Sequence, residues 1–132
     1  MIERIEHNGK LFALVMRASY KPKGVNFITP ADNPLQLGVL VHRRNSKITP
    51  HVHMESAKTV NEIQEVLHIV KGRVEAEFYE SEGRKFTSIV LTSGDTILLL
   101  SGGHGFNILE DSKIIEVKQG PYGGVEEDKV RL

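Results

Sequence analysis

The chain has 132 residues, with 17 lysines and arginines, 17 aspartates and glutamates, and no cysteine. This length is typical of one domain, so we expect a single domain over residues 1–132. Without cysteine, the chain can form neither a disulfide framework nor a thiolate metal site. The formal net charge of zero argues against a nucleic-acid partner, and no apolar run is long enough to span a membrane. We therefore expect a cytoplasmic protein that acts on a small molecule.

Short segments that alternate between apolar and polar residues predict β-strands along most of the chain. In residues 72–80, for example, Val74, Ala76 and Phe78 share one face and the polar residues share the other. Only residues 55–64 could form a helix, of a turn or two. The predicted strands lie within residues 11–16, 35–44, 50–53, 65–70, 72–80, 81–91, 96–100 and 104–120, the last range holding two strands joined by a turn at residues 110–112. This pattern predicts an all-β sandwich or barrel.

Two histidines and a glutamate stand out in the segment TPHVHMESAKTVNEIQEVLHIVKG, residues 49–72. On a strand, His51 and His53 would point to the same side, about 7 Å apart. By the same alternation Glu65 shares a face with Leu67 and Ile69, where an ionised carboxylate is costly to bury unless it is paired. A divalent metal would satisfy both features. The alternative is that the histidines are exposed and the glutamate is solvated.

A second segment, SGDTILLLSGGHGFNI, places His104 in a glycine-rich turn directly after an apolar strand. It supplies a third imidazole from a distant part of the chain. The metal interpretation is therefore favoured over that of a solvated pair.

These two segments resemble the two motifs of the cupin family. In the first, H-x-H is followed by Glu65 and then, after six residues, by Gly72. The second opens on Gly-Asp and ends on a histidine shortly before an asparagine. The matching positions of the second motif, residues 94–107, are Gly94, Asp95, Gly102, His104 and Asn107.

The resemblance implies a cupin-type double-stranded β-helix, or jelly-roll barrel. It also implies one divalent transition metal, such as zinc, manganese, iron, nickel or copper, on His51, His53, Glu65 and His104. The gap between His53 and Glu65 is longer than the family usually has. This leaves Glu62 and Glu55 as rival carboxylate ligands. Leu100 stands where the second motif usually has a proline.

Two basic residues are candidates for substrate binding or catalysis. Arg44, near the end of a predicted strand, could hold a substrate carboxylate or phosphate. Lys118 could transfer protons or hold an anion if the polar set of its strand, which includes Glu116, faces inward. If Ile115 and Val117 face inward instead, Lys118 lies on a solvated face. His68 is out of register with Glu65 and is expected to face away from the site.

The function expected from the resemblance is a small metal-dependent enzyme that acts on an oxygen-rich molecule. The C-terminal tail comprises residues 119–132. The segment EVKQGPYGG, residues 116–124, where it begins, looks like that of small cupins associated with bacterial surface-polysaccharide genes, which favours a sugar derivative. Isomerase or epimerase chemistry and oxygenase chemistry both remain open. The alternatives are a metal-binding module without turnover, and a site whose histidines contact a ligand without a metal. Small cupins usually pair, and exposed strand edges favour being covered, so we expect a homodimer.

Overall fold

The structure is a computed structural model that describes residues 1–121, 123–125 and 130–132. The chain divides into two compact units. The first unit comprises Met1–Tyr20 and Glu62–Leu132, and the second unit comprises Lys21–Asn61. Whether both belong to one domain, as the length predicts, stays a prediction.

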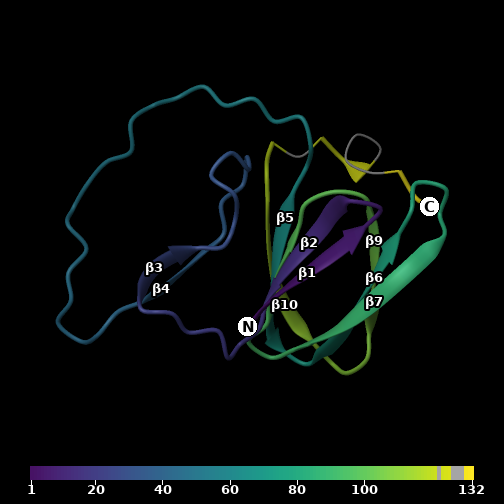
Figure 1. The fold of residues 1–132 in the computed structure, drawn as a ribbon, viewed down its shortest axis with the longest axis horizontal. Coiled ribbons are helices and arrows are strands. Elements are labelled where there is room, and N and C mark those ends of the chain that lie inside the picture. Colours follow the sequence, from purple (N-terminus) through teal and green to yellow (C-terminus); the bar gives the residue numbers. More distant parts are fainter. Residues whose placement is uncertain (122, 126–129) are drawn as a thin grey trace. The chain divides into compact units, whose positions relative to one another are not determined.

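The first unit contains a five-stranded and a three-stranded sheet, in which every pairing is antiparallel (Figure 1). The five-stranded sheet has the order β1-β2-β8-β5-β10, and the three-stranded sheet has the order β7-β6-β9. The strands of the larger sheet are β1 (Ile2–His7), β2 (Lys10–Met16), β5 (Glu65–Lys71), β8 (Thr96–Leu99) and β10 (Lys113–Lys118). Those of the smaller sheet are β6 (Arg73–Tyr79), β7 (Lys85–Thr92) and β9 (Gly103–Ile108).

The core lies between the inner faces of these two sheets. Leu67 and Ile69 of β5 are buried there, as are Val74, Ala76 and Phe78 of β6. The predicted alternation along residues 72–80 is therefore confirmed. Strand β8 is buried on both faces, which explains why its sequence reads as an uninterrupted apolar run.

A close approach of two turns fixes the connection between β5 and β6. Gly72 lies between these strands with φ of 108°, and a Cβ atom there would collide with the backbone of Asp111 and the side chain of Ser112. Only glycine combines an unstrained positive φ with the absence of a Cβ atom. The glycine that closes the first sequence motif thus has a structural reason of its own.

The all-β fold class is confirmed, and most predicted strands are present. Strands β1 and β3 were not predicted, and residues 50–53 form no strand. The two strands within residues 104–120 do not pair with each other, because β9 pairs with β6 and β10 pairs with β5. Residues 55–64 are not helical, and no helix among the described residues is long and apolar enough to cross a membrane.

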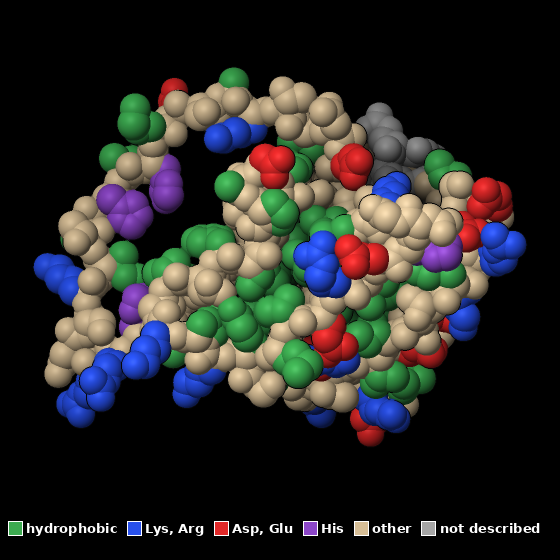
Figure 2. Space-filling view, viewed as in Figure 1, with side chains coloured by type: hydrophobic (Ala, Val, Ile, Leu, Met, Phe, Trp, Pro, Cys, Tyr) green, Lys and Arg blue, Asp and Glu red, His purple; other side chains and the backbone are tan. Residues whose placement is uncertain are grey.

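The second unit contains one two-stranded antiparallel ribbon. Its strands are β3 (Gly24–Phe27) and β4 (Gly38–Val41). No residue of Lys21–Asn61 is buried. Lysine and arginine side chains gather on the visible face of this unit (Figure 2).

Candidate functional site

A glutamate–histidine pair joins the two sheets of the first unit. Glu65 begins β5 and His104 lies on β9, where it pairs with the buried Phe78. Both side chains therefore lie on the inner faces of their sheets, and His104 Nε2 is 2.9 Å from Glu65 Oε1. Each side chain remains partly accessible. The structure thus brings together two of the four predicted metal ligands, which are 39 positions apart in the sequence.

The surroundings of Glu65 keep its carboxylate ionised. The hydrogen bond with His104 lowers the pKa of Glu65 most strongly, and burial opposes it. A hydrogen bond with Glu116 and the charges of His104 and Lys118 lower it further, so that the pKa is about 2. At neutral pH the group is therefore available as an anionic ligand or hydrogen-bond acceptor.

The polar side chains of strand β10, Glu116 and Lys118, lie on the same face of the sheet as Glu65. Glu116 pairs with Leu67 and Lys118 pairs with Glu65, so both side chains lie on the inner side of the sheet. Lys118 Nζ is 3.8 Å from Glu116 Oε2. The orientation that the sequence left open is thereby decided, and it places Lys118 on the same face as Glu65.

The other two predicted ligands, His51 and His53, belong to the second unit. Both are exposed and lie outside any strand, so they do not have the predicted strand alternation. Their rings are nevertheless neighbours, with centroids 5.2 Å apart. His51 Nδ1 lies 2.7 Å from the carbonyl oxygen of Thr49. Because a carbonyl oxygen only accepts hydrogen bonds, Nδ1 carries a proton in this contact, and Nε2 is the ring atom that a metal would bind.

The predicted ligands thus occur as two pairs, one in each unit. Among residues 1–121, 123–125 and 130–132, no three His, Asp or Glu side chains form a metal-binding group. The rival carboxylate Glu55 is exposed in the second unit, as is Arg44. The four-ligand set and the role of Arg44 therefore stay predictions.

A small pocket of about 310 Å³ adjoins His104. Its lining includes Glu62, the second rival carboxylate, together with Lys10 and Ser101. Two residues after Glu62, the backbone N–H of Gln64 donates a hydrogen bond to Gln119 Oε1 at 2.7 Å. Gln119 Nε2 is buried without a hydrogen-bond partner among the described residues. Nothing in the sequence pattern singled out these two glutamines.

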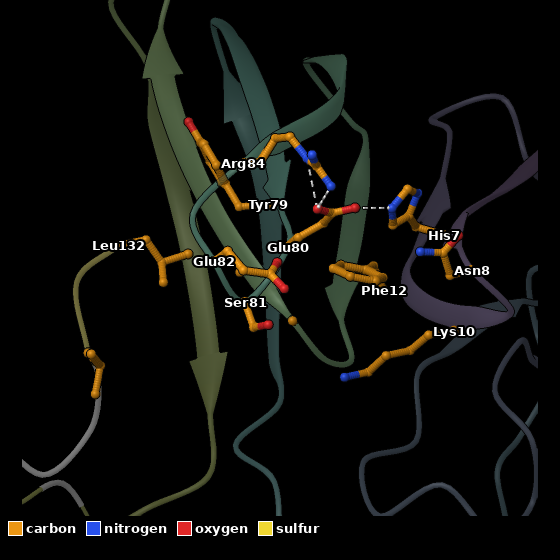
Figure 3. Close-up of a pocket in the computed structure, with 13 residues that line it drawn as sticks. His7, Asn8, Lys10, Phe12, Tyr79, Glu80, Ser81, Glu82, Arg84 and Leu132 are labelled. Carbon is orange, nitrogen blue, oxygen red and sulfur yellow. Dashed lines mark hydrogen bonds and ion pairs between the residues drawn. The ribbon is translucent and has the colours of Figure 1, made fainter.

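A larger hollow of about 750 Å³ lies at the turns between β1 and β2 and between β6 and β7 (Figure 3). Glu80 accepts hydrogen bonds there from His7 Nε2 at 2.5 Å and from Arg84 at 2.6 and 2.9 Å. These contacts lower the pKa of Glu80, that with His7 most strongly. The His7 ring stacks on Phe86, with centroids 4.0 Å apart. The hydrogen bond between His7 and Glu80 links the two turns. These residues are 73 positions apart, and the sequence pattern did not predict their contact.

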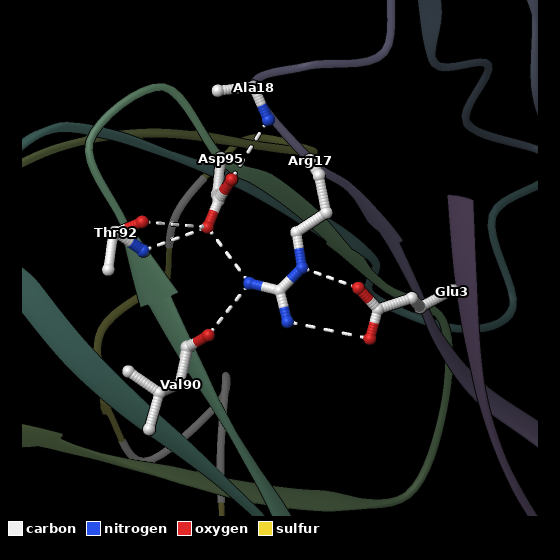
Figure 4. Close-up of polar contacts among 6 residues, drawn as sticks. All are labelled: Glu3, Arg17, Ala18, Val90, Thr92 and Asp95. Carbon is white, nitrogen blue, oxygen red and sulfur yellow. Dashed lines mark hydrogen bonds and ion pairs between the residues drawn. The ribbon is translucent and has the colours of Figure 1, made fainter. Parts of the chain in front are cut away.

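The aspartate of the second motif, Asp95, has a structural role (Figure 4). Its side chain accepts hydrogen bonds from the backbone N–H of Ala18 at 2.9 Å and of Thr92 at 2.8 Å. It also accepts one from Arg17 at 2.9 Å, and Arg17 in turn pairs with Glu3. Asp95 therefore holds the start of β8 to the ends of β2 and β7.

No protein-family model, no curated protein and no solved structure matches this chain.

Proposed function

We propose that the chain is a cupin-type protein that binds one divalent transition metal through His51, His53, Glu65 and His104. The observation that carries this proposal is the Glu65–His104 pair, which lies on the inner faces of both sheets with an ionised carboxylate. The pairing of a five-stranded with a three-stranded antiparallel sheet supports the finer jelly-roll class. The inclusion of His51 and His53 comes from the sequence motif.

The chemistry of the donors fits such a metal. Imidazole and carboxylate together suit zinc, iron, nickel and manganese. Histidine ligands usually donate their second ring N–H to a carbonyl or carboxylate, which fixes the tautomer and the ring orientation. His51 has this arrangement, through Nδ1 and the carbonyl of Thr49. A carboxylate with a pKa of about 2 also needs no deprotonation before it binds a cation.

The substrate class we propose is a polar, oxygen-rich molecule such as a sugar derivative. A bound divalent metal would supply a Lewis acid that polarises substrate oxygens. Lys118 lies on the inner face beside Glu65, where an ammonium group can hold an anionic or hydroxyl-bearing substrate. Isomerase or epimerase chemistry would use Lys118 or Glu116 to move a proton, and oxygenase chemistry on the same ligands is its rival.

One observation favours a second candidate, a metal- or ligand-binding module without turnover. Glu116 and Lys118 lie within ion-pair distance of each other, which reduces the capacity of either to act as a base or an acid. The pocket beside His104, about 310 Å³, is also at the small end of ligand sites.

The metal content of the purified protein tests the proposal. We expect close to one equivalent of a transition metal in untagged protein, by plasma mass spectrometry, and its loss from the double variant His51→Ala/His53→Ala. The variant His42→Ala, which removes an exposed histidine of the same unit, should retain it. Protein that contains no metal, and takes none up from manganese, iron, nickel or zinc salts, would contradict the ligand assignment.

A further inference from the structure

The hollow of Figure 3 and the small pocket beside His104 adjoin each other in the first unit, since Lys10 and Gly102 line both. Gly102 has φ of 78° and lies against the Phe12 ring, with which a Cβ atom would collide. No side chain of residue 102 therefore separates the two spaces. Among the described residues, Lys10 supplies the one side chain that borders both. A ligand that binds beside His104 can accordingly extend into the hollow, whose volume of about 750 Å³ is more than twice the 310 Å³ of the pocket.

Two turns form the walls of the hollow. The turn between β1 and β2 supplies Asn8 and Lys10, and the turn between β6 and β7 supplies Ser81 and Glu82. The hydrogen bonds that Glu80 accepts from both sides hold these turns together. A site whose walls are already fixed loses less conformational entropy when it binds a ligand.

The polar side chains of these walls are available to a ligand. Asn8, Lys10, Ser81 and Glu82 are exposed, and their side chains form no hydrogen bond or ion pair with the described residues. Lys10 and Glu82 extend from opposite turns into the space between them (Figure 3). An ammonium group donates hydrogen bonds, a carboxylate accepts them, and amide and hydroxyl groups do both. Because sugar hydroxyls also donate and accept, a ligand rich in hydroxyl groups can use this mixture.

The charge of the lining argues against a strongly charged ligand. A phosphate or carboxylate held by Lys10 would lie near the unpaired carboxylates of Glu62 and Glu82, and like charges brought together oppose binding. A cation would meet Lys10 and Arg84 in the same way. The described lining of the two spaces includes two basic residues, Lys10 and Arg84, and three acidic residues, Glu62, Glu80 and Glu82.

We propose that the hollow and the pocket form one binding site for an uncharged oligosaccharide of at least two sugar rings. One end of the ligand lies beside His104, and the next ring lies in the hollow between Lys10 and Glu82. The sugar class rests on the proposed function, whereas the length and the absence of charge come from the hollow. The hollow lies well within the usual size range of ligand sites, while the pocket alone is at its small end.

A glycan array that carries neutral and acidic glycans of increasing length tests the proposal. We expect the parent protein to bind neutral glycans of two or more rings. By isothermal titration calorimetry, the best of these should bind about tenfold or more tightly than the corresponding monosaccharide, the effect of one or two additional hydrogen bonds.

Substitutions at Ser81 test whether the hollow is occupied. Ser81 is exposed and its side chain points into the hollow, so Ser81→Trp should fill part of that space (Figure 3). We expect this variant to bind the oligosaccharide about tenfold or more weakly, as loss of a well-packed contact does. The matched variant Ser81→Ala leaves the hollow open and should stay within about threefold of the parent.

Substitutions at Lys10 separate hydrogen bonding from charge. Lys10→Gln retains an N–H donor without the positive charge, so the affinity for an uncharged ligand should fall by no more than about threefold. Lys10→Ala removes the donor and should weaken binding by about tenfold. If the site takes an anion, both variants lose binding.

Three results would overturn the inference. The first is a parent protein that binds no neutral glycan, or acidic glycans only. The second is equal affinity for a monosaccharide and the longer glycan. The third is a Ser81→Trp variant with the parent's circular dichroism and the parent's affinity.

Metal content, measured on the same samples, separates this inference from the proposed function. A protein that contains metal and binds no neutral glycan contradicts the inference alone. A protein without metal whose glycan binding is lost in Ser81→Trp supports the inference and contradicts the metal assignment.

Discussion

The substitution Asp95→Ala should lower the free energy of unfolding by about 3–5 kcal/mol, the usual effect of removing one partner from a buried ion pair. The Asp95 side chain is only 4% exposed and receives hydrogen bonds from two backbone N–H groups as well as from Arg17. Its loss leaves the N–H of Ala18 and part of the Arg17 guanidinium without this acceptor. Asp95→Asn retains one carbonyl oxygen and should cost less, about 1.5–3 kcal/mol. Urea or guanidinium denaturation measures both values.

The other carboxylate on Arg17 provides the control. Glu3 pairs with the same guanidinium, and its side chain is 34% exposed. Glu3→Gln should therefore cost no more than about 1 kcal/mol, as is usual for accessible ion pairs. Equal losses for Asp95→Ala and Glu3→Gln would show that the buried hydrogen bonds of Asp95 do not stabilise the fold.

The stability that Asp95 provides should also depend on pH. Burial raises its pKa, but the hydrogen bonds from Thr92, Ala18 and Arg17 outweigh burial, and the net pKa lies below its usual value. The unfolded chain then takes up a proton at higher pH than the native protein. The contribution is consequently complete above about pH 4 and is lost as the pH falls through the lower native value. The difference in unfolding free energy between the parent and Asp95→Asn should be larger at pH 7 than at pH 3.

The sequence predicted the larger elements of the first unit for identifiable reasons. Alternation placed Val74, Ala76 and Phe78 inward, and the apolar run of residues 96–100 marked a strand covered on both faces. Strand β1 was missed because its charged residues, such as Glu3 and Arg4, obscured a strand whose side chains are only partly buried. Pairing partners were not predictable, since β9 and β10 are neighbours in sequence and belong to different sheets.

The candidate site was only partly visible in the sequence. The pattern identified Glu65 and His104 by residue type, and the structure adds that they meet at 2.9 Å. The sequence pattern could not show which side chains of β10 face inward. Either Glu116 and Lys118 or Ile115 and Val117 could do so, because the two pairs alternate along the strand. The strand expected at His51 and His53 is absent, since no neighbouring strand pairs with these residues in the described chain. Glu80 and Gln119 carried no signal because His7, which bonds Glu80, and Gln64, which bonds Gln119, are distant from them in sequence.

Removing either member of the Glu65–His104 pair should weaken metal binding by more than about 100-fold, since loss even of groups that only orient ligands costs 10–100-fold. Glu65→Ala deletes the carboxylate that is ionised at neutral pH, and His104→Ala deletes the imidazole 2.9 Å from it. Isothermal titration with zinc or manganese, on protein stripped of metal, measures the change in affinity.

His68 provides the matched control on the same strand. It points to the opposite face of β5 from Glu65, and its Nδ1 lies 2.8 Å from Thr96 Oγ1. His68→Ala should therefore leave the metal affinity within about threefold of the parent, because His68 is not a ligand. The variant Glu62→Ala tests whether Glu62, the rival carboxylate, binds the metal in place of Glu65. If Glu62→Ala abolishes binding and Glu65→Ala does not, then Glu62 is the carboxylate ligand, and the ionised Glu65 serves instead to hold His104 between the sheets.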